Sequence, residues 1–176
     1  MLNENAQNME WGFDFTPEYC IQCHACEVAC RTWRKTDLWV SRRRVFGVTS
    51  GAYPNTKMQT FSLACMHCVR PACVAACPKK ALSKCENGMV ALNAALCVGC
   101  GLCARACPYQ VPKISNRLMV KCDMCAEQFP LGEGAPPCAC VCPTGALSLR
   151  MMTCDEKTAQ EQRMKQALHD KKNEYQ

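Results

Sequence analysis

The chain has few aromatic side chains and no long apolar segment. Phe, Trp and Tyr make up only 7% of its 176 residues, which is little material for the core of one domain or two small ones. No stretch approaches the roughly 18 apolar residues that a membrane helix needs, and residues 1–19 have no apolar run of signal-peptide length. We therefore expect no direct membrane span and a cytoplasmic location by its own sequence, or an extracytoplasmic one by co-export with a signal-bearing partner.

Cysteine is the residue that the chain has in excess, with 19 copies. Sixteen of them fall into four runs: Cys20, Cys23, Cys26 and Cys30; Cys65, Cys68, Cys73 and Cys77; Cys97, Cys100, Cys103 and Cys107; Cys122, Cys125, Cys138 and Cys142. The first and third runs have the C-x2-C-x2-C-x3-C spacing of bacterial ferredoxins, and the other two are stretched versions of it. Proline follows the last cysteine in three runs. Four quartets of thiolates predict four [4Fe–4S] clusters and an electron carrier.

The spacing has a physical cause. A cubane cluster needs one thiolate on each iron, and two residues between ligands let a tight loop wrap three corners of the cube. Backbone N–H groups of that loop then point at the sulfurs. The fourth cysteine lies on the helix that starts near the third, so it ligates the other cluster of a pair. Proline after it cannot continue the helix and turns the chain outward.

Disulfides and zinc are the two other uses of so many cysteines. The odd cysteine count and the absence of a signal peptide disfavour a secreted disulfide scaffold. Zinc sites use two C-x2-C pairs and rarely a triplet followed by Cys-Pro. Clusters are therefore favoured, and their ligation should supply much of the folding free energy, so that no stable fold is expected without iron and sulfide. A zinc-stabilised binding module is the alternative, and it would be colourless.

The formal net charge of +6 is no sign of nucleic-acid binding once clusters are counted. An oxidised cubane with four thiolates carries roughly −2, so four of them bring the total to about −2. The cationic surplus then balances cluster charge, and we expect no nucleic-acid partner. The cations within or beside the runs are Arg31, Arg70, Lys79, Lys80, Arg105 and Lys121. They tune the reduction potentials or solvate the surface, and the sequence favours neither role.

The segments between the runs predict an α+β fold of short β-hairpins and short helices. We expect strands at residues 13–16, 45–49 and 58–63, a hairpin around Asn87-Gly88, and a helix at 26–36 with Trp33 on its buried side. Residues 153–172 predict a helix, because Thr153 and Glu156 match a capping box and Met164 and Leu168 share a face. The charged face of this helix is solvated or docks on a partner.

The chain thus divides into three parts. Residues 1–10 form a loose tail, 11–152 a four-cluster ferredoxin-like domain, and 153–176 a charged C-terminal helix. Within the domain, runs two and three form an inner unit at 65–107. Runs one and four form an outer unit from 11–64 and 108–152 that encloses it, so that two ferredoxin-like units interleave.

Several sequence segments, together with the four cysteine runs, resemble those of one protein family. These are Val40-Ser41-Arg42-Arg43-Arg44-Val45-Phe46, Tyr53-Pro54, Phe61-Ser62-Leu63-Ala64-Cys65-Met66-His67-Cys68 and Lys121-Cys122-Asp123-Met124-Cys125. The chain is similar over roughly residues 11–150 to the iron–sulfur subunits of the dimethyl sulfoxide reductase family of molybdenum and tungsten oxidoreductases.

The resemblance implies the ligands of each cluster. Cluster 1 takes Cys20, Cys23, Cys26 and Cys142; cluster 2 takes Cys122, Cys125, Cys138 and Cys30; cluster 3 takes Cys65, Cys68, Cys73 and Cys107; cluster 4 takes Cys97, Cys100, Cys103 and Cys77. Some relatives carry a [3Fe–4S] cluster where a cysteine of the third run is replaced, but Cys100 is present here. All four sites are therefore expected to hold [4Fe–4S] clusters.

The resemblance also implies partners. Such subunits dock on a large molybdopterin-dependent catalytic subunit, which alone holds the molybdenum or tungsten, and exchange electrons with a quinol-linked membrane anchor subunit or a soluble carrier. This chain has no general base, nucleophile or open metal site, so it is not expected to be an enzyme alone. The alternative is a free-standing soluble polyferredoxin, which would not need segment 31–64 or the C-terminal helix.

Five further residues invite a functional role. Cys85, Cys140 and Cys154 are left over; Cys140 makes the choice in run four ambiguous, although the x3-Cys-Pro pattern favours Cys138 and Cys142. His24 and His67 lie between ligands, but Rieske-type ligation replaces cysteines and none is missing here. We expect the histidines to donate N–H bonds to sulfur or to be exposed.

Overall fold

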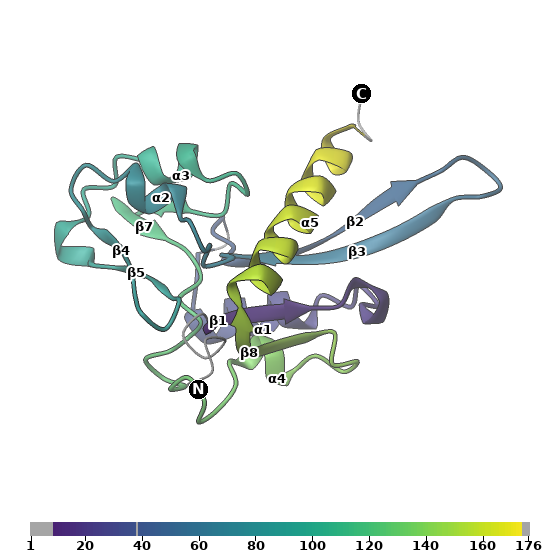
Figure 1. The fold of residues 1–176 in the computed structure, drawn as a ribbon, viewed down its shortest axis with the longest axis horizontal. Coiled ribbons are helices and arrows are strands. Elements are labelled where there is room, and N and C mark those ends of the chain that lie inside the picture. The colour runs from purple at the N-terminus through teal and green to yellow at the C-terminus, as the bar shows by residue number, and fades with distance from the viewer. Residues whose placement is uncertain (1–8, 38, 174–176) are drawn as a thin grey trace, which may run out of the picture.

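The first and last of the described strands pair with each other. In the computed structural model, which describes residues 9–37 and 39–173, β1 (Met9–Phe15) runs antiparallel to β8 (Leu147–Thr153) (Figure 1). Met9 lies opposite Thr153 and Phe15 opposite Leu147. Residues 1–8 of the expected tail lie outside the described residues. Met9 and Glu10, which the sequence interpretation counted with that tail, belong to β1.

A second antiparallel pair forms a long ribbon. β2 (Arg43–Ser50) pairs with β3 (Lys57–Ala64), which confirms the two strands expected in this segment. The half of β3 nearest the body is buried, from Thr60 to Ala64, whereas residues 49–59 are exposed. The ribbon therefore projects from the body (Figure 1), and its base contributes the stacked Phe46 and Phe61 rings, 5.7 Å apart, to the core.

Two short hairpins follow. The hairpin expected around Asn87-Gly88 is present, with β4 (Leu82–Lys84) paired to β5 (Val90–Leu92) and Gly88 at a φ of 87° that favours glycine. The pair β6 (Lys113–Ser115) and β7 (Leu118–Val120) was not expected. Its turn is Asn116-Arg117, both at positive φ, and Arg at such a position is not a turn signal that sequence reasoning uses.

The helices before the C-terminal one are short. They are α1 (Ala25–Arg34), α2 (Ala72–Ala75), α3 (Leu102–Ala106) and α4 (Pro137–Cys140), with 3-10 turns η2 (Pro17–Tyr19) and η3 (Ala94–Leu96). α1 packs against α4 and α2 against α3, so that segments distant in sequence meet. Trp33 on α1 is 49% exposed, which contradicts the expected buried position. Its ring lies against Phe129, 5.3 Å between centroids, at the surface of the 125–138 loop.

The C-terminal helix α5 (Cys154–Asn173) confirms the helix predicted at 153–172. Its capping box is present: Glu156 N donates to Thr153 Oγ1 at 3.1 Å and Thr153 N donates to Glu156 Oε2 at 2.8 Å. Met164 and Ala167 are buried where α5 contacts β1, β2, β3 and β8. Within residues 9–37 and 39–173, every helix is too short or too polar to cross a membrane.

The apolar core is divided in two. The larger part combines residues from both ends of the chain: Phe15, Val45, Val48, Phe61, Leu63, Tyr109, Leu147 and Met164, among others. The smaller part contains Leu82, Val90, Cys103 and Met119. Short strands, short helices and one terminal helix confirm the α+β class. Cysteines of the four runs lie in or against both parts, so the thiols are integral to the core.

Candidate iron–sulfur cluster sites

Each cysteine run lies on a tight loop that leads into a short helix. The third cysteine of every run stands at the start of a helix: Cys26 on α1, Cys73 on α2, Cys103 on α3 and Cys138 on α4. Residues between the ligands adopt positive φ angles, namely Gln22, His24, His67, Gly99, Gly101 and Met124. Such left-handed residues wind the backbone tightly. The loops therefore have the curvature that the C-x2-C spacing predicts.

The thiols of the first run meet a cysteine of the fourth. Burial raises the pKa of Cys20, and the nearby thiols of Cys26, Cys142 and Cys23 raise it further. Cys142 itself has a lowered pKa: burial opposes the shift, but backbone N–H groups around Thr144, Ala146 and Leu147 outweigh it. This cysteine is held near run one by the pairing of β1 with β8. These four thiols are the expected ligands of cluster 1.

The second set joins the end of run one to run four. Burial raises the pKa of Cys30 to about 12, and the thiols of Cys122, Cys138 and Cys125 add to the shift. α1 and α4 carry Cys30 and Cys138 and pack against each other. Met124 N donates to Cys122 Sγ at 3.4 Å. The structure thus brings together the four residues expected for cluster 2.

The third set is formed by run two and the last cysteine of run three. Burial raises the pKa of Cys68, and the negative charge of Glu161 raises it further. The thiols of Cys65, Cys107 and Cys73 add to the same shift. Cys65 has a pKa raised by burial to about 11. Protonated thiols are thus strongly favoured at these buried positions, and only a cation such as iron would make thiolates stable there.

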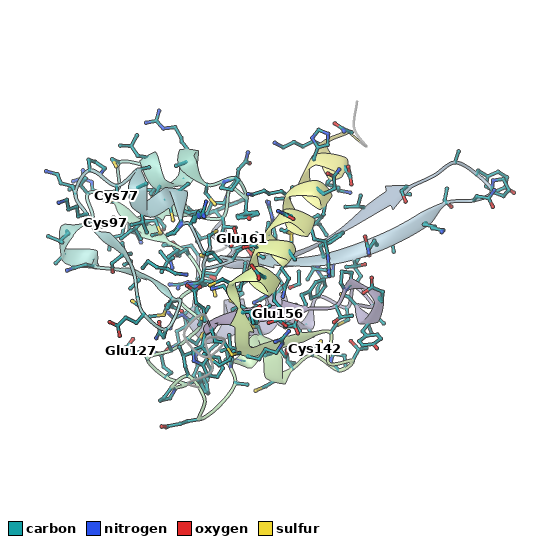
Figure 2. The ribbon with its side chains drawn as sticks, in the orientation of Figure 1. Cys77, Cys97, Glu127, Cys142, Glu156 and Glu161 are labelled. Atoms are coloured by element: carbon teal, nitrogen blue, oxygen red, sulfur yellow. The ribbon has the colours of Figure 1, made fainter. Side chains whose placement is uncertain are left out.

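The fourth set lines one cavity. Cys77, Cys97, Cys100 and Cys103 border it together with apolar side chains of β4, β5 and β7. Ala81 N donates to Cys77 Sγ at 3.3 Å. Figure 2 shows Cys77 and Cys97 together beside α2 and β4, far from Cys142 beside α4 and β8. The expected ligands of cluster 4 therefore share one pocket at one end of the molecule.

Neighbouring sets are close enough for their thiols to affect one another. The charge of Cys26 in the first set raises the pKa of Cys138 in the second. Cys122 of the second set likewise raises the pKa of Cys65 in the third. Cys73 of the third set raises the pKa of Cys103 in the fourth. The four sets thus follow one another in a row, each beside the next.

Buried cations stand between sets. Arg43 is 2% exposed, with its Nη1 donating to Ser62 Oγ at 2.9 Å and its guanidinium 4.3 Å from the centre of the Phe13 ring. Burial lowers the pKa of Arg43, but the thiols of Cys138, Cys122 and Cys26 outweigh burial and raise it. Its buried Nη2 has no partner within the described residues. A buried cation among thiols, with a donor to spare, fits a cluster of negative charge.

The cations expected beside the runs divide into two kinds. Lys121 is 5% exposed, whereas Arg70, Lys79, Lys80 and Arg105 are exposed and Arg31 is half-buried. Sequence reasoning therefore found one buried cation among six candidates. It gave no role to Arg43 or to Lys157, both buried; the run of three arginines at 42–44 was the signal available for the first.

The two histidines differ. His24 is exposed and its Nδ1 lies 3.1 Å from Glu27 Oε2. His67 is fully buried; its Nδ1 accepts from Val90 N at 2.9 Å, and its Nε2 has no partner among the described residues. Of the surplus cysteines, Cys140 is exposed with its Sγ 3.2 Å from Ala135 O, and Cys85 and Cys154 are half-buried.

The donor chemistry suits cubane clusters. Within residues 9–37 and 39–173, no three His, Cys, Asp or Glu side chains are gathered in the way that a single metal ion requires. A cubane has four irons at separate corners, and each takes one thiolate. Four thiols on N–H-rich loops, with buried cations beside them, therefore fit a [4Fe–4S] cluster.

Several known proteins are similar in sequence to this chain. Residues 56–152 match the family described as a 4Fe-4S dicluster domain. Over 149 residues the chain is 34% identical to the B subunit of the anaerobic dimethyl sulfoxide reductase of Haemophilus influenzae, an alignment that covers 78% of this chain and 72% of the relative. The corresponding subunit of Escherichia coli K12 is 33% identical over 148 residues, with the same coverage. The protein NrfC of that strain is 35% identical over 148 residues, covering 82% of this chain and 66% of the relative.

Proposed function

Because the chain belongs to the 4Fe-4S dicluster family and, with it, to the iron–sulfur B subunits of anaerobic dimethyl sulfoxide reductases, we propose that it is a non-catalytic electron-transfer subunit with four [4Fe–4S] clusters. It carries electrons between a catalytic subunit that holds a molybdenum or tungsten pterin and a quinol-linked membrane subunit or soluble carrier. [4Fe–4S] clusters supply one-electron transfer without proton or bond chemistry. The compartment follows that of the catalytic partner.

The observation that carries this proposal is the row of four thiol sets, in which each set lies beside the next. Electron transfer over the length of a subunit needs redox centres in sequence. The protein's part is to hold the sixteen thiolates, to bury six of them and partly bury eight more, and to place N–H groups and cations against them. In the two-unit arrangement that we propose, residues 65–107 form the inner unit and residues 11–64 with 108–152 form the outer one.

Elemental analysis tests the cofactor content. Material isolated anaerobically with its partner should contain about sixteen irons per copy of this chain. About eight irons or fewer, or stoichiometric zinc, would contradict the proposal. A free-standing polyferredoxin would elute near 20 kDa on gel filtration, whereas a subunit elutes with a much larger chain that contains molybdenum or tungsten.

The ligand assignment has its own test, and run four offers a matched pair. Cys142→Ser should remove one cluster's EPR signal or convert it to a three-iron signal, because Cys142 is the proposed ligand beside run one. Cys140→Ser, two residues away on an exposed thiol, should leave all four signals unchanged. The reverse pattern would show that the ligand in run four has been misassigned.

A further inference from the structure

Lys121 is a buried cation without a carboxylate. Its side chain is 5% exposed, and its ammonium donates to Val90 O at 2.5 Å and to Cys122 O at 2.9 Å. In the part of the chain that the structure describes, no Asp or Glu lies within ion-pair distance of it. Two carbonyl oxygens do not balance a full charge removed from water, so its counter-charge comes from elsewhere.

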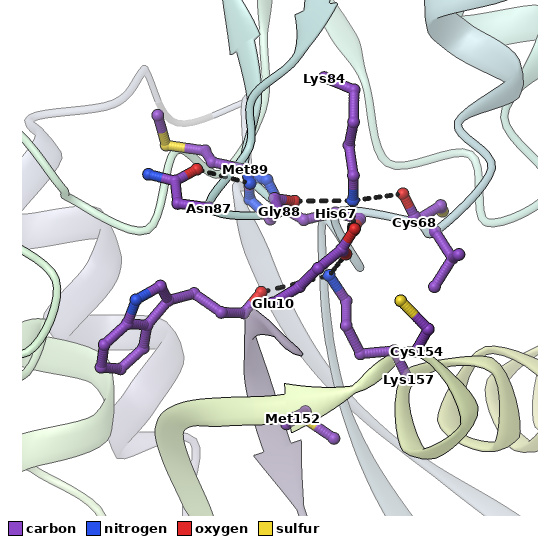
Figure 3. Close-up of polar contacts among 12 residues, drawn as sticks. Glu10, His67, Cys68, Lys84, Asn87, Gly88, Met89, Met152, Cys154 and Lys157 are labelled. Atoms are coloured by element: carbon purple, nitrogen blue, oxygen red, sulfur yellow. Dashed lines mark hydrogen bonds and ion pairs between the residues drawn. The ribbon is translucent and has the colours of Figure 1, made fainter. Parts of the chain in front are cut away.

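The other lysines nearby are paired. Figure 3 shows Lys84 and Lys157 converging on Glu10, whose Oε2 lies 2.6 Å from one ammonium and 2.5 Å from the other. Lys84 also donates to the carbonyls of His67 and Cys68. The fold therefore supplies a carboxylate where it buries lysines for structural purposes. At Lys121 it does not.

Lys121 lies between backbone loops of two different sets. It precedes Cys122 of the second set in sequence, and its ammonium donates to the Cys122 carbonyl. The ammonium also donates to the carbonyl of Val90, whose N–H donates to His67 between Cys65 and Cys68 of the third set. The ammonium thus lies at the junction between the second and third sets, which belong to different proposed units.

Val90 forms backbone hydrogen bonds to both sides of this junction. Its C=O accepts from Lys121, while its N–H donates to Nδ1 of His67 at 2.9 Å. His67 lies between the ligands Cys65 and Cys68, and Val90 is 1% exposed on β5. One buried residue thus fixes the loop of run two and the ammonium beside run four relative to each other.

We propose that Lys121 sets the reduction potentials of the two clusters that flank this junction, the one at Cys30, Cys122, Cys125 and Cys138 and the one at Cys65, Cys68, Cys73 and Cys107. Each reduction adds one electron and one negative charge, and no bond forms or breaks. A fixed positive charge between the two sites stabilises both reduced forms and raises both potentials. This inference rests on the proposed function, because it requires clusters at these thiols.

The test compares variants of Lys121 in the complex as purified, by EPR-monitored redox titration. Lys121→Met removes the charge at similar size, Lys121→Gln removes it but keeps a hydrogen-bond donor, and Lys121→Arg keeps it. Lys113→Met, at an exposed lysine of β6, is the control. In the Met and Gln variants, two of the four midpoints should fall by at least a tenfold change in the reduction equilibrium, which is about 59 mV for one electron. In the Arg variant and the control, the reduction equilibrium of each of the four clusters should stay within about threefold of the wild-type value.

The outcomes separate the two proposals. Wild-type complex with far fewer than about sixteen irons per chain refutes the proposed function itself. With full iron in wild type and variants, four unchanged midpoints, or four midpoints that fall together, overturn the inference about Lys121 alone. If both the Met and the Gln variants lose iron while the control keeps it, Lys121 is a structural residue and the inference also fails.

Discussion

The surroundings of the second and fourth thiol sets differ in charge. Arg43 and Lys121 are buried beside the second set, with Arg42 half-buried near them. The cavity of the fourth set is bordered by apolar side chains, and the lysine at its edge, Lys79, is exposed. The same sequence motif is thus placed in two electrostatic environments.

This difference shows that the motif and its environment are separate properties of the chain. The cysteine spacing determines where a cluster is held, since a tight loop and a short helix suffice for that. Buried cations from other segments, Arg43 on β2 and Lys121 after β7, set the charge around it. The second set has such segments packed against it because the large core surrounds it, whereas the fourth set adjoins the small core.

The largest expected effect comes from removal of iron and sulfide. Anaerobic chelation should abolish the cooperative unfolding transition, because ligation supplies much of the folding free energy. Residual amide protection should be confined to β1–β8, β2–β3 and α5, which share the large core. Residues 72–107, which supply three of the four buried members of the small core, should exchange with opening free energies near zero. Hydrogen exchange checks this, and equal protection of both regions would contradict it.

The next largest effect is expected at the half-buried carboxylate of Glu10, which pairs with the buried Lys157. Glu10→Gln leaves the ammonium groups of Lys157 and Lys84 without a counter-charge, and breaking such a buried pair costs about 3–5 kcal/mol. Anaerobic denaturant unfolding of the loaded protein measures the loss. Glu18→Gln, at an exposed residue of η2, is the control and should change stability by less than about 0.5 kcal/mol. Similar losses in both variants would refute this account of Glu10.

The same carboxylate should make stability depend on pH. Burial raises the pKa of Glu10, but hydrogen bonds and charge from Lys157 and Lys84 outweigh it, so the pKa lies below its ordinary value of 4.5. A lowered folded pKa contributes stability that is complete above the unfolded value and is lost as the pH falls through the folded one. The difference in unfolding free energy between wild type and Glu10→Gln should therefore shrink on acidification below about 4.5. A constant difference would contradict this sign.

A smaller effect is expected from Arg43. Arg43→Met should lower the potentials of the clusters beside it by roughly a tenfold change in the one-electron equilibrium, about 59 mV. Arg105→Met, on the exposed side of α3 near the fourth set, should leave every potential unchanged, because water screens its charge. Redox titration of the two variants compares the two environments directly. Equal shifts would mean that burial of the cation is unimportant.

The smallest effect concerns the start of α5. Thr153→Ala removes the side-chain oxygen that accepts from Glu156 N, and loss of such a cap costs about 1 kcal/mol. The effect should appear as lower stability with unchanged potentials, because the cap carries no charge toward the thiol sets. Thr56→Ala, in the exposed turn between β2 and β3, is a control expected to change stability less. A shift in the midpoint potential of any cluster would show that the start of α5 also affects the reduction potentials.

Sequence reasoning recovered what short-range rules control. The loops of the four runs, the Asn87-Gly88 hairpin and the capped helix at 153–172 are local features, and they are present. It missed what long-range packing controls. The burial of Arg43 and Lys121 depends on β2 and β7 meeting cysteine loops far along the chain, and the pairing of Met9 with Thr153 makes a strand of residues that look like a tail.

The exposure of Trp33 has the same origin. Its helical position alone favours a buried side, but the 125–138 loop supplies Phe129 as a partner at the surface. Asn116 suits a positive φ angle, but Arg117 beside it does not signal one, and so the β6–β7 hairpin was unexpected. The exposure of Trp33 thus depends on a neighbour distant in sequence, and the hairpin depends on a backbone angle that the residue type does not indicate.

The pairing of β1 with β8 has a consequence for biosynthesis. Residues 9–15 leave the ribosome well before their partners at 147–153. Hairpins such as β4–β5 close over a few residues and can form as soon as they are translated. The sheet that joins β1 to β8 must wait until residue 153 has emerged, so this is the last of the described strand pairs that can form during translation.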